Sequence, residues 1–217
     1  MIFRIPGILS FSELEQIRTQ LAAARFVDGR LTAGWYAKQV KDNQQIPAAQ
    51  AKDLQTQVKA ACNRHPLFQA AVRPKQIHSL LFSRYEVGMA YGRHADNAMM
   101  GQWRSDISFT VFLNEPEDYA GGELVIEGAD DEQAYKLPAG SAIFYPASTL
   151  HRVETVTQGT RFVAVGWVQS LVRDAAKREL LFDLDTVRRS LFAREGKTDE
   201  FDLLSKSVAN LLRRWAE

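Results

Sequence analysis

The middle of the chain consists of short runs of β-branched and aromatic residues separated by glycine and proline. These runs lie between Ile77 and Val168 and read IHSLLFSRY, DISFTVFLN, GGELVIEG, GSAIFYPA, HRVETV and RFVAVGWV. Residues of this kind favour strands, and Gly and Pro favour the turns between them. Many short strands joined by turns predict a barrel or a sandwich rather than a parallel sheet with helical crossovers.

Helical patterns precede this strand-rich region. Ser10 followed by Glu13 has the form of a capping box, and apolar residues then recur at helical spacing, so we expect a helix over about 11–24. A second helix is predicted over about 48–62, ended by residues 63–66. We expect these helices to pack on the outside of the strands, in an α+β protein that is mainly β.

The chain becomes helical again after Ser170, with a break near Gly196. The predicted apolar faces are Leu180, Leu184, Val187 and Leu191 on the first helix, and Phe201, Leu204, Val208, Leu211 and Trp215 on the second. We therefore expect a main domain over 1–172, helical to about 75 and strand-rich over about 76–170, followed by a helical module over 173–217. Amphipathic helices of this kind leave a homodimer open.

Composition narrows the classes of partner and the compartment. Lys and Arg total 27 against 26 Asp and Glu, so the net charge of +1 gives no broad field to attract nucleic acid or a membrane surface. The single cysteine, Cys62, forms no internal disulfide, which fits a reducing compartment. With neither a secretory signal nor a run of transmembrane length, the simplest interpretation is a cytoplasmic protein.

Two of the four histidines stand where a metal site would need them. In His94-Ala95-Asp96 the two polar side chains are two residues apart, so on a strand both project to the same side. His151 comes much later, at the start of another predicted strand, and a barrel can bring it beside His94. Two imidazoles and one carboxylate on one face of an ion are typical of non-haem Fe(II) oxygenases. The other two histidines are not expected to be ligands.

Arg161 follows His151 by ten residues, after a predicted Thr157-Gln158-Gly159 turn that would return the chain as an antiparallel neighbour. It begins an otherwise apolar strand, so we expect its side chain to point inward. A guanidinium matches a carboxylate in bidentate fashion and stays charged in a dry pocket. A zinc hydrolase or a non-catalytic, cupin-like iron sensor could use the same three metal ligands, but neither needs this arginine.

Several motifs together resemble one family, the PKHD-type hydroxylases, within the prolyl-4-hydroxylase-like branch of the Fe(II)/2-oxoglutarate dioxygenases. The resemblance covers about residues 80–170, and the C-terminal helices are similar to that family's extra module. The residues that carry it are Arg84-Tyr85-x-x-Gly88-x-x-Tyr91-x-x-His94-x-Asp96-Asn97, Phe112-Leu113-Asn114, Gly121-Gly122-Glu123-Leu124, Pro138-x-Gly140, His151-Arg152-Val153, Arg161 and Gly166-Trp167-Val168-Gln169-Ser170.

The resemblance implies a double-stranded β-helix of the jelly-roll kind, with iron held by His94, Asp96 and His151. It also implies 2-oxoglutarate bound at Arg161, dioxygen as the other cosubstrate, and L-ascorbate as the reductant that keeps the iron ferrous. The implied activity is hydroxylation of a C–H bond in an unidentified peptidyl, prolyl or small-metabolite substrate, with a link to iron uptake.

The remaining contacts to the cosubstrate are less constrained by the resemblance. Wider relatives often place a tyrosine where this chain has Phe112, so the hydroxyl must come from Tyr85 or Tyr91, or from Tyr145 as third choice. Trp167 shares a strand face with Arg161 and either walls the cosubstrate pocket or is a core residue. Segment 97–106, which contains Trp103, follows the metal ligands and is a candidate lid.

Overall fold

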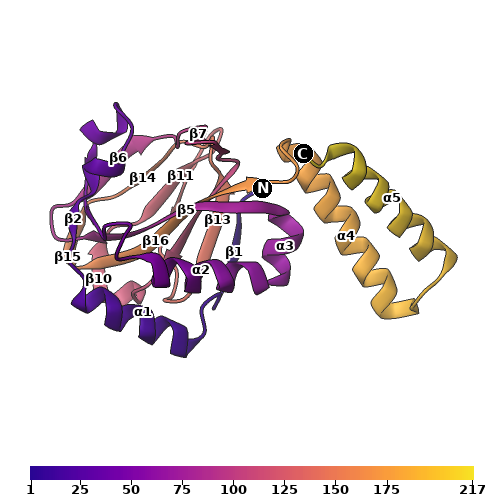
Figure 1. Cartoon of the computed structure of the whole chain (residues 1–217), viewed down its shortest axis with the longest axis horizontal. Coiled ribbons are helices and arrows are strands. Elements are labelled where there is room, and N and C mark those ends of the chain that lie inside the picture. The colour runs from indigo at the N-terminus through magenta and orange to yellow at the C-terminus, as the bar shows by residue number, and fades with distance from the viewer.

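The computed structural model describes residues 1–217 and has a strand-rich body with a helical hairpin at one end (Figure 1). The body contains a seven-stranded and a five-stranded sheet, and every strand pairing in them is antiparallel. The larger sheet has the order β1 (Phe3–Ile5), β13 (Ala142–Pro146), β9 (Ile107–Phe112), β16 (Arg161–Ser170), β5 (Pro74–Tyr85), β4 (Gln44–Gln45), β2 (Val27–Asp28). The smaller has the order β12 (Glu132–Tyr135), β11 (Leu124–Glu127), β14 (His151–Val153), β6 (Ala90–His94), β3 (Lys41–Asp42).

Two short pairs and three 3-10 turns complete the body. The pairs are β7 (Met99–Met100) with β8 (Trp103–Arg104) and β10 (Tyr119–Gly121) with β15 (Val156–Gly159), and the turns are η1 (Gly29–Thr32), η2 (Ala37–Gln39) and η3 (Pro116–Asp118). Side chains alternate along the central strands, so each strand of the larger sheet has an outer and an inner face. Two facing antiparallel sheets form the expected jelly-roll.

The two faces of the larger sheet bury different cores. Helices α1 (Phe11–Ala23), α2 (Lys52–Arg64) and α3 (Pro66–Val72) cover its outer face. The core there joins α1 and α2 to the sheet through residues such as Ile17, Val58, Phe109 and Phe144. The second core, which includes Ile126 and Val163, lies between the two sheets. The prediction that the N-terminal helices pack outside the strands is therefore confirmed.

Local signals placed most elements close to their observed limits. The capping box of α1 is present, with the Ser10 side chain accepting from the Glu13 backbone and the Glu13 carboxylate accepting from the Ser10 backbone. Residues 63–66 end α2 as expected, but Pro66 also begins α3, which was not predicted. The N-terminal region also supplies β1 to β4, which were not predicted, because strands of two or three residues are too short to show an alternating pattern.

Two predictions about the later strands are wrong. The HRVETV run forms two strands, since β14 ends at Val153 and β15 begins at Val156. The expected return of the chain at 157–159 does not occur, because β15 pairs with β10 while β16 pairs with β5 and β9. Arg161 is therefore placed by the larger sheet and not by pairing with the His151 strand.

The C-terminal hairpin consists of α4 (Ala175–Glu195) and α5 (Asp199–Trp215), and it stands beside the body (Figure 1). Gly196 ends α4 with a φ of +71°, as the predicted break requires. The apolar face of α5 packs as expected, around Val208. The predicted face of α4 is only partly right, because Leu180 and Val187 are exposed, whereas the buried residues of this helix are Arg178, Leu181 and Asp185.

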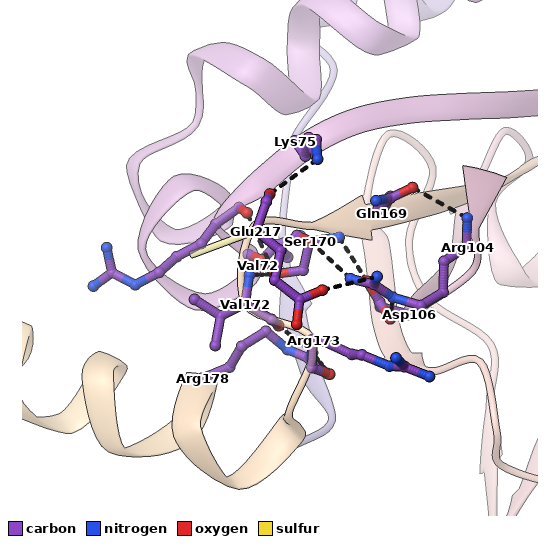
Figure 2. A network of polar contacts seen from close by, with 11 residues as sticks. Val72, Lys75, Arg104, Asp106, Gln169, Ser170, Val172, Arg173, Arg178 and Glu217 are labelled. Atoms are coloured by element: carbon purple, nitrogen blue, oxygen red, sulfur yellow. Dashed lines mark hydrogen bonds and ion pairs between the residues drawn. The ribbon is translucent and has the colours of Figure 1, made fainter. Parts of the chain in front are cut away.

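Polar contacts fix the hairpin to the body (Figure 2). The Arg178 guanidinium donates to the carbonyl oxygens of Val172 and Arg173 at 2.7 and 2.8 Å, which sets the rotation of α4. At the end of the chain, Glu217 accepts from Lys75 and Arg104. The Arg178 bonds explain why Leu180 and Val187 on α4 face outward, because they turn the side of the helix that carries Arg178 toward the body. None of the helices is long and apolar enough to span a membrane.

Candidate metal centre and adjoining cavity

The fold brings His94, Asp96 and His151 together. Strands β6 and β14 are neighbours in the smaller sheet, and His94 lies directly opposite His151 in their register. Strand β6 ends at His94, so Asp96 lies in the loop beyond it instead of on the strand. One ligand atom from each residue lies within 4.8 Å of the other two, and the distance from His151 Nε2 to Asp96 Oδ2 is 3.8 Å. The three predicted ligands form one cluster that could hold an ion.

Backbone carbonyls orient both imidazoles. The Nδ1 atom of His94 lies 2.8 Å from the Gly92 carbonyl oxygen, and Nδ1 of His151 lies 3.0 Å from the Thr149 carbonyl oxygen. Because a carbonyl only accepts, each Nδ1 carries the hydrogen and leaves the Nε2 lone pair for a metal. Burial, together with the neighbouring His151, lowers the pKa of His94 to about 4, so this imidazole is neutral.

Asp96 and the imidazole rings are held by further contacts. The Ser108 hydroxyl donates to Asp96 Oδ2 at 2.5 Å, which fixes that carboxylate from β9. The Tyr91 ring stacks on His94 with a centroid distance of 3.7 Å, and the Tyr145 ring meets His151 edge-on at 5.1 Å. Tyr91 therefore supports the His94 ring, and Tyr145 supports the His151 ring.

A cavity of about 450 Å³ joins the metal cluster to Arg161. Its walls come mainly from the inner faces of the two sheets and from segments 32–45 and 95–101. The predicted residues Tyr85, Tyr91 and Trp167 all line it. Of the predicted lid, residues 97 and 99–101 reach the cavity, whereas Trp103 does not.

Arg161 is deeply buried without an acidic partner. Its side chain is 1% exposed, and its Nε and Nη1 atoms have no hydrogen-bond partner. No carboxylate lies within 4.0 Å of it, although a buried charge normally requires one. A dicarboxylate that reaches from the metal cluster would supply the missing anion, so the residues present fit both an iron ion and 2-oxoglutarate.

Aromatic residues surround this guanidinium. Its Cζ atom lies 5.0 Å from the centre of the Tyr85 ring and 5.8 Å from that of Phe112. Burial raises the pKa of the Tyr85 and Tyr119 phenols, and the adjacent positive charge of Arg161 opposes this. Tyr85 and Phe112 thus both lie beside Arg161, and Tyr119 brings a second phenol near the same guanidinium.

Tyr119 was not identified from the sequence, because nothing in the Tyr119-Ala120-Gly121-Gly122 segment marks this phenol as a neighbour of Arg161. Gly122, in the same segment, is the sequence feature that could have indicated a close approach to Arg161. Gly122 has a φ of +68°, and a Cβ atom there would lie 3.0 Å from Arg161 Cδ. A side chain at this position would therefore press on the arginine.

Comparison with known proteins agrees with this geometry. Residues 80–169 match the 2OG-Fe(II) oxygenase superfamily, and residues 175–217 match the PKHD-type hydroxylase C-terminal domain. A PKHD-type hydroxylase from Picosynechococcus sp. is 67% identical, with all of both chains covered.

Solved structures share the fold at low identity. An oxidoreductase of the 2OG-Fe(II) oxygenase family from Burkholderia pseudomallei has a TM-score of 0.60 at 17% identity, covering 77% of this chain and 85% of that one. A prolyl hydroxylase from Trichoplax adhaerens, in complex with a hypoxia inducible factor peptide fragment, has a TM-score of 0.58 at 15% identity, covering 82% and 86%. On its full-length identity to the curated relative, the chain belongs to the PKHD-type hydroxylases, Fe(II)- and 2-oxoglutarate-dependent enzymes of the 2OG-Fe(II) oxygenase superfamily.

Proposed function

We propose that His94, Asp96 and His151 hold Fe(II) and that Arg161 binds the far carboxylate of 2-oxoglutarate, in an enzyme that hydroxylates a C–H bond. The observation that carries this is the buried guanidinium with two unpartnered nitrogen atoms, in the same cavity as the three metal-ligating side chains. A zinc hydrolase or an iron sensor leaves that charge without a role.

When bound, iron and 2-oxoglutarate supply the oxidising chemistry, using dioxygen and giving succinate and carbon dioxide. The protein supplies ligation, orientation and a site that excludes water. Gly92 and Thr149 hold the two imidazoles in the ligating tautomer, and Ser108 holds the carboxylate. Arg161 neutralises the far end of the cosubstrate in a setting with little water to screen the charge.

We assign the cosubstrate's remaining contacts by position in the cavity. Tyr85, together with Tyr119, supports Arg161 and offers a phenol to the same carboxylate. Tyr91, stacked on His94, would contact 2-oxoglutarate on the metal side of the cavity. Trp167 shares the inner face of β16 with Arg161 and would form part of the pocket wall beside the cosubstrate.

The substrate is proposed to be a peptidyl or prolyl residue or a small metabolite. The naming of structural neighbours as prolyl hydroxylases and the resemblance to this family support that class. The same resemblance supports L-ascorbate as the reductant and a link to iron uptake. A cytoplasmic location, the division into 1–172 and 173–217, and a homodimer through the C-terminal helices remain proposals from the sequence.

The cofactor assignment is tested by loading metal-free protein with Fe(II) under anaerobic conditions and titrating 2-oxoglutarate. We expect a saturable visible charge-transfer band that vanishes in Asp96→Ala and needs much more 2-oxoglutarate in Arg161→Ala. Arg93→Ala, which removes an exposed arginine paired with Glu127, is the matched control and should resemble the wild type. Tight metal binding without any band would contradict the proposal.

A further inference from the structure

A second buried cation lines the cavity, and the proposed function gives it no role. Lys41 is 5% exposed and lies on β3, at the edge of the smaller sheet. It stands opposite Tyr91 in the register, and its Nζ atom is 5.2 Å from the centre of the Tyr91 ring, which stacks on His94. The ammonium therefore lies on the metal side of the cavity.

The Lys41 ammonium uses one of its three N–H donors on the protein. Nζ donates to the Thr32 hydroxyl at 3.0 Å, and that hydroxyl in turn donates to Gln45 Oε1 at 2.5 Å. No carboxylate lies within 4.0 Å of Nζ. Burial lowers the pKa of Lys41 to about 8, and the charges of Asp96 and Asp28 oppose that effect, so the amine remains largely protonated at neutral pH. A buried ammonium with unused donors is costly unless an anion meets it.

The charges around the cavity show which anion is missing. Apart from His94 and His151, the charged residues among those that line it are Lys41, Asp96 and Arg161. Once Fe(II) and doubly charged 2-oxoglutarate are bound, they balance Asp96 and Arg161. The positive charge of Lys41 is then left over, on the side of the cavity that holds the metal cluster.

We propose that Lys41 binds a carboxylate of the primary substrate and so selects a substrate with a single negative charge near the C–H bond to be hydroxylated. This inference rests on the proposed function. Leu81, Met99 and Val165 also line the cavity, so the substrate needs an apolar body beside its carboxylate. An acylated amino acid or the C-terminal end of a peptide has this chemistry.

The test measures equilibrium binding and needs no turnover. The enzyme is loaded with Mn(II), which binds in place of iron without the oxidation chemistry, and is saturated with 2-oxoglutarate. N-acetylproline is then compared with N-acetylprolinamide, and benzoate with benzamide, through tryptophan fluorescence and calorimetry. Each pair differs in charge and little in shape, so the ratio of the two dissociation constants reports the charge preference.

We expect wild type to bind the carboxylate about tenfold to a hundredfold more tightly than the amide, the range expected for a hydrogen bond to a charged group. Lys41→Met should abolish this preference and Lys41→Arg should keep part of it. Lys38→Met, which removes an exposed lysine on η2, should leave it unchanged. All four proteins should bind 2-oxoglutarate equally.

The outcomes separate the two proposals. Absence of a carboxylate preference in wild type, including failure of every probe to bind, overturns the role of Lys41. So does an unchanged preference in Lys41→Met. Weaker 2-oxoglutarate binding in Lys41→Met would assign the lysine to the cosubstrate and also overturn the inference. Failure of wild type to bind 2-oxoglutarate would instead contradict the proposed function.

Discussion

Arg161 and Tyr85 lie directly opposite each other on β16 and β5, with the guanidinium carbon 5.0 Å from the centre of the phenol ring. This cross-strand pair places a charge and a hydroxyl at the same depth inside the jelly-roll. The seven-stranded sheet fixes both positions, so the arginine is held in place before any cosubstrate arrives. Such preorganisation lowers the entropic cost of binding.

The first prediction concerns this pair. Arg161→Ala should weaken 2-oxoglutarate binding by about a hundredfold or more, because it removes a buried charged partner, and Arg161→Lys should fall between this variant and wild type. Tyr85→Phe should cost only about fivefold, the worth of one hydrogen bond. Calorimetric titration of the Mn(II)-loaded protein measures these constants, with Tyr135→Phe as the control. An Arg161→Ala constant within twofold of wild type would refute the assignment.

Ser108 should affect the metal without touching it. Its hydroxyl orients the Asp96 carboxylate, and loss of such an outer contact typically lowers metal affinity about 10- to 100-fold. We expect Ser108→Ala to show this loss when the protein competes with a fluorescent chelator for Fe(II) or Mn(II). Ser83→Ala, which removes a cavity hydroxyl bonded to Gln45, should bind metal like wild type. Equal affinities in the two variants would contradict the role of Ser108.

Asp106 should stabilise the junction between the body and the C-terminal hairpin (Figure 2). Its carboxylate accepts from Arg104 Nε at 2.7 Å and from the Ser170 backbone at 2.8 Å, and it is 6% exposed. Asp106→Ala leaves these donors without a partner, so we expect the free energy of unfolding to fall by about 1–3 kcal/mol. Urea unfolding measures this against Asp183→Ala, an exposed change on α4. Equal stability of the two variants would argue against this role.

Glu13 should make stability depend on pH. Its hydrogen bonds with Arg64 lower the pKa of its carboxyl from 4.5 to about 2, and they join α1 to α2. The carboxylate therefore contributes stability above pH 4.5, and this contribution is lost as the pH falls toward 2. Glu13→Gln should flatten the loss between these values in urea unfolding. Glu15 pairs with Arg18 inside α1 and does not join two helices, so Glu15→Gln should keep the wild-type slope.

Cys62 should be inert in the native protein. Its side chain is fully buried in the core under α2, and burial raises the pKa of the thiol to about 12. Because the thiolate is the reactive form, labelling by iodoacetamide should be very slow until the protein unfolds. The labelling rate should rise sharply at the urea midpoint seen by circular dichroism. Fast labelling in native buffer would show that α2 opens locally.

Local patterns in the sequence predicted most of the elements and the main residues of the candidate site. Capping, alternation and glycine breaks act over a few neighbouring residues, so α1, α5 and the central strands could be predicted. The His94-x-Asp96 spacing, His151 and Arg161 could be recognised because their chemistry is unusual for positions within or beside strands. The structure brings these four residues to one cavity.

The remaining features depend on contacts between distant segments of the chain. Tyr119 comes to lie beside Arg161 and Lys41 reaches the cavity because β10 pairs with β15 and β3 pairs with β6, and pairings between such short strands leave no local pattern. Likewise, the hydrogen bonds of the buried Arg178 set the rotation of α4, and part of the apolar face predicted for this helix is therefore exposed. The sequence records which side chains are available, but contacts between distant segments decide which of them meet, because pairing and burial depend on the whole fold.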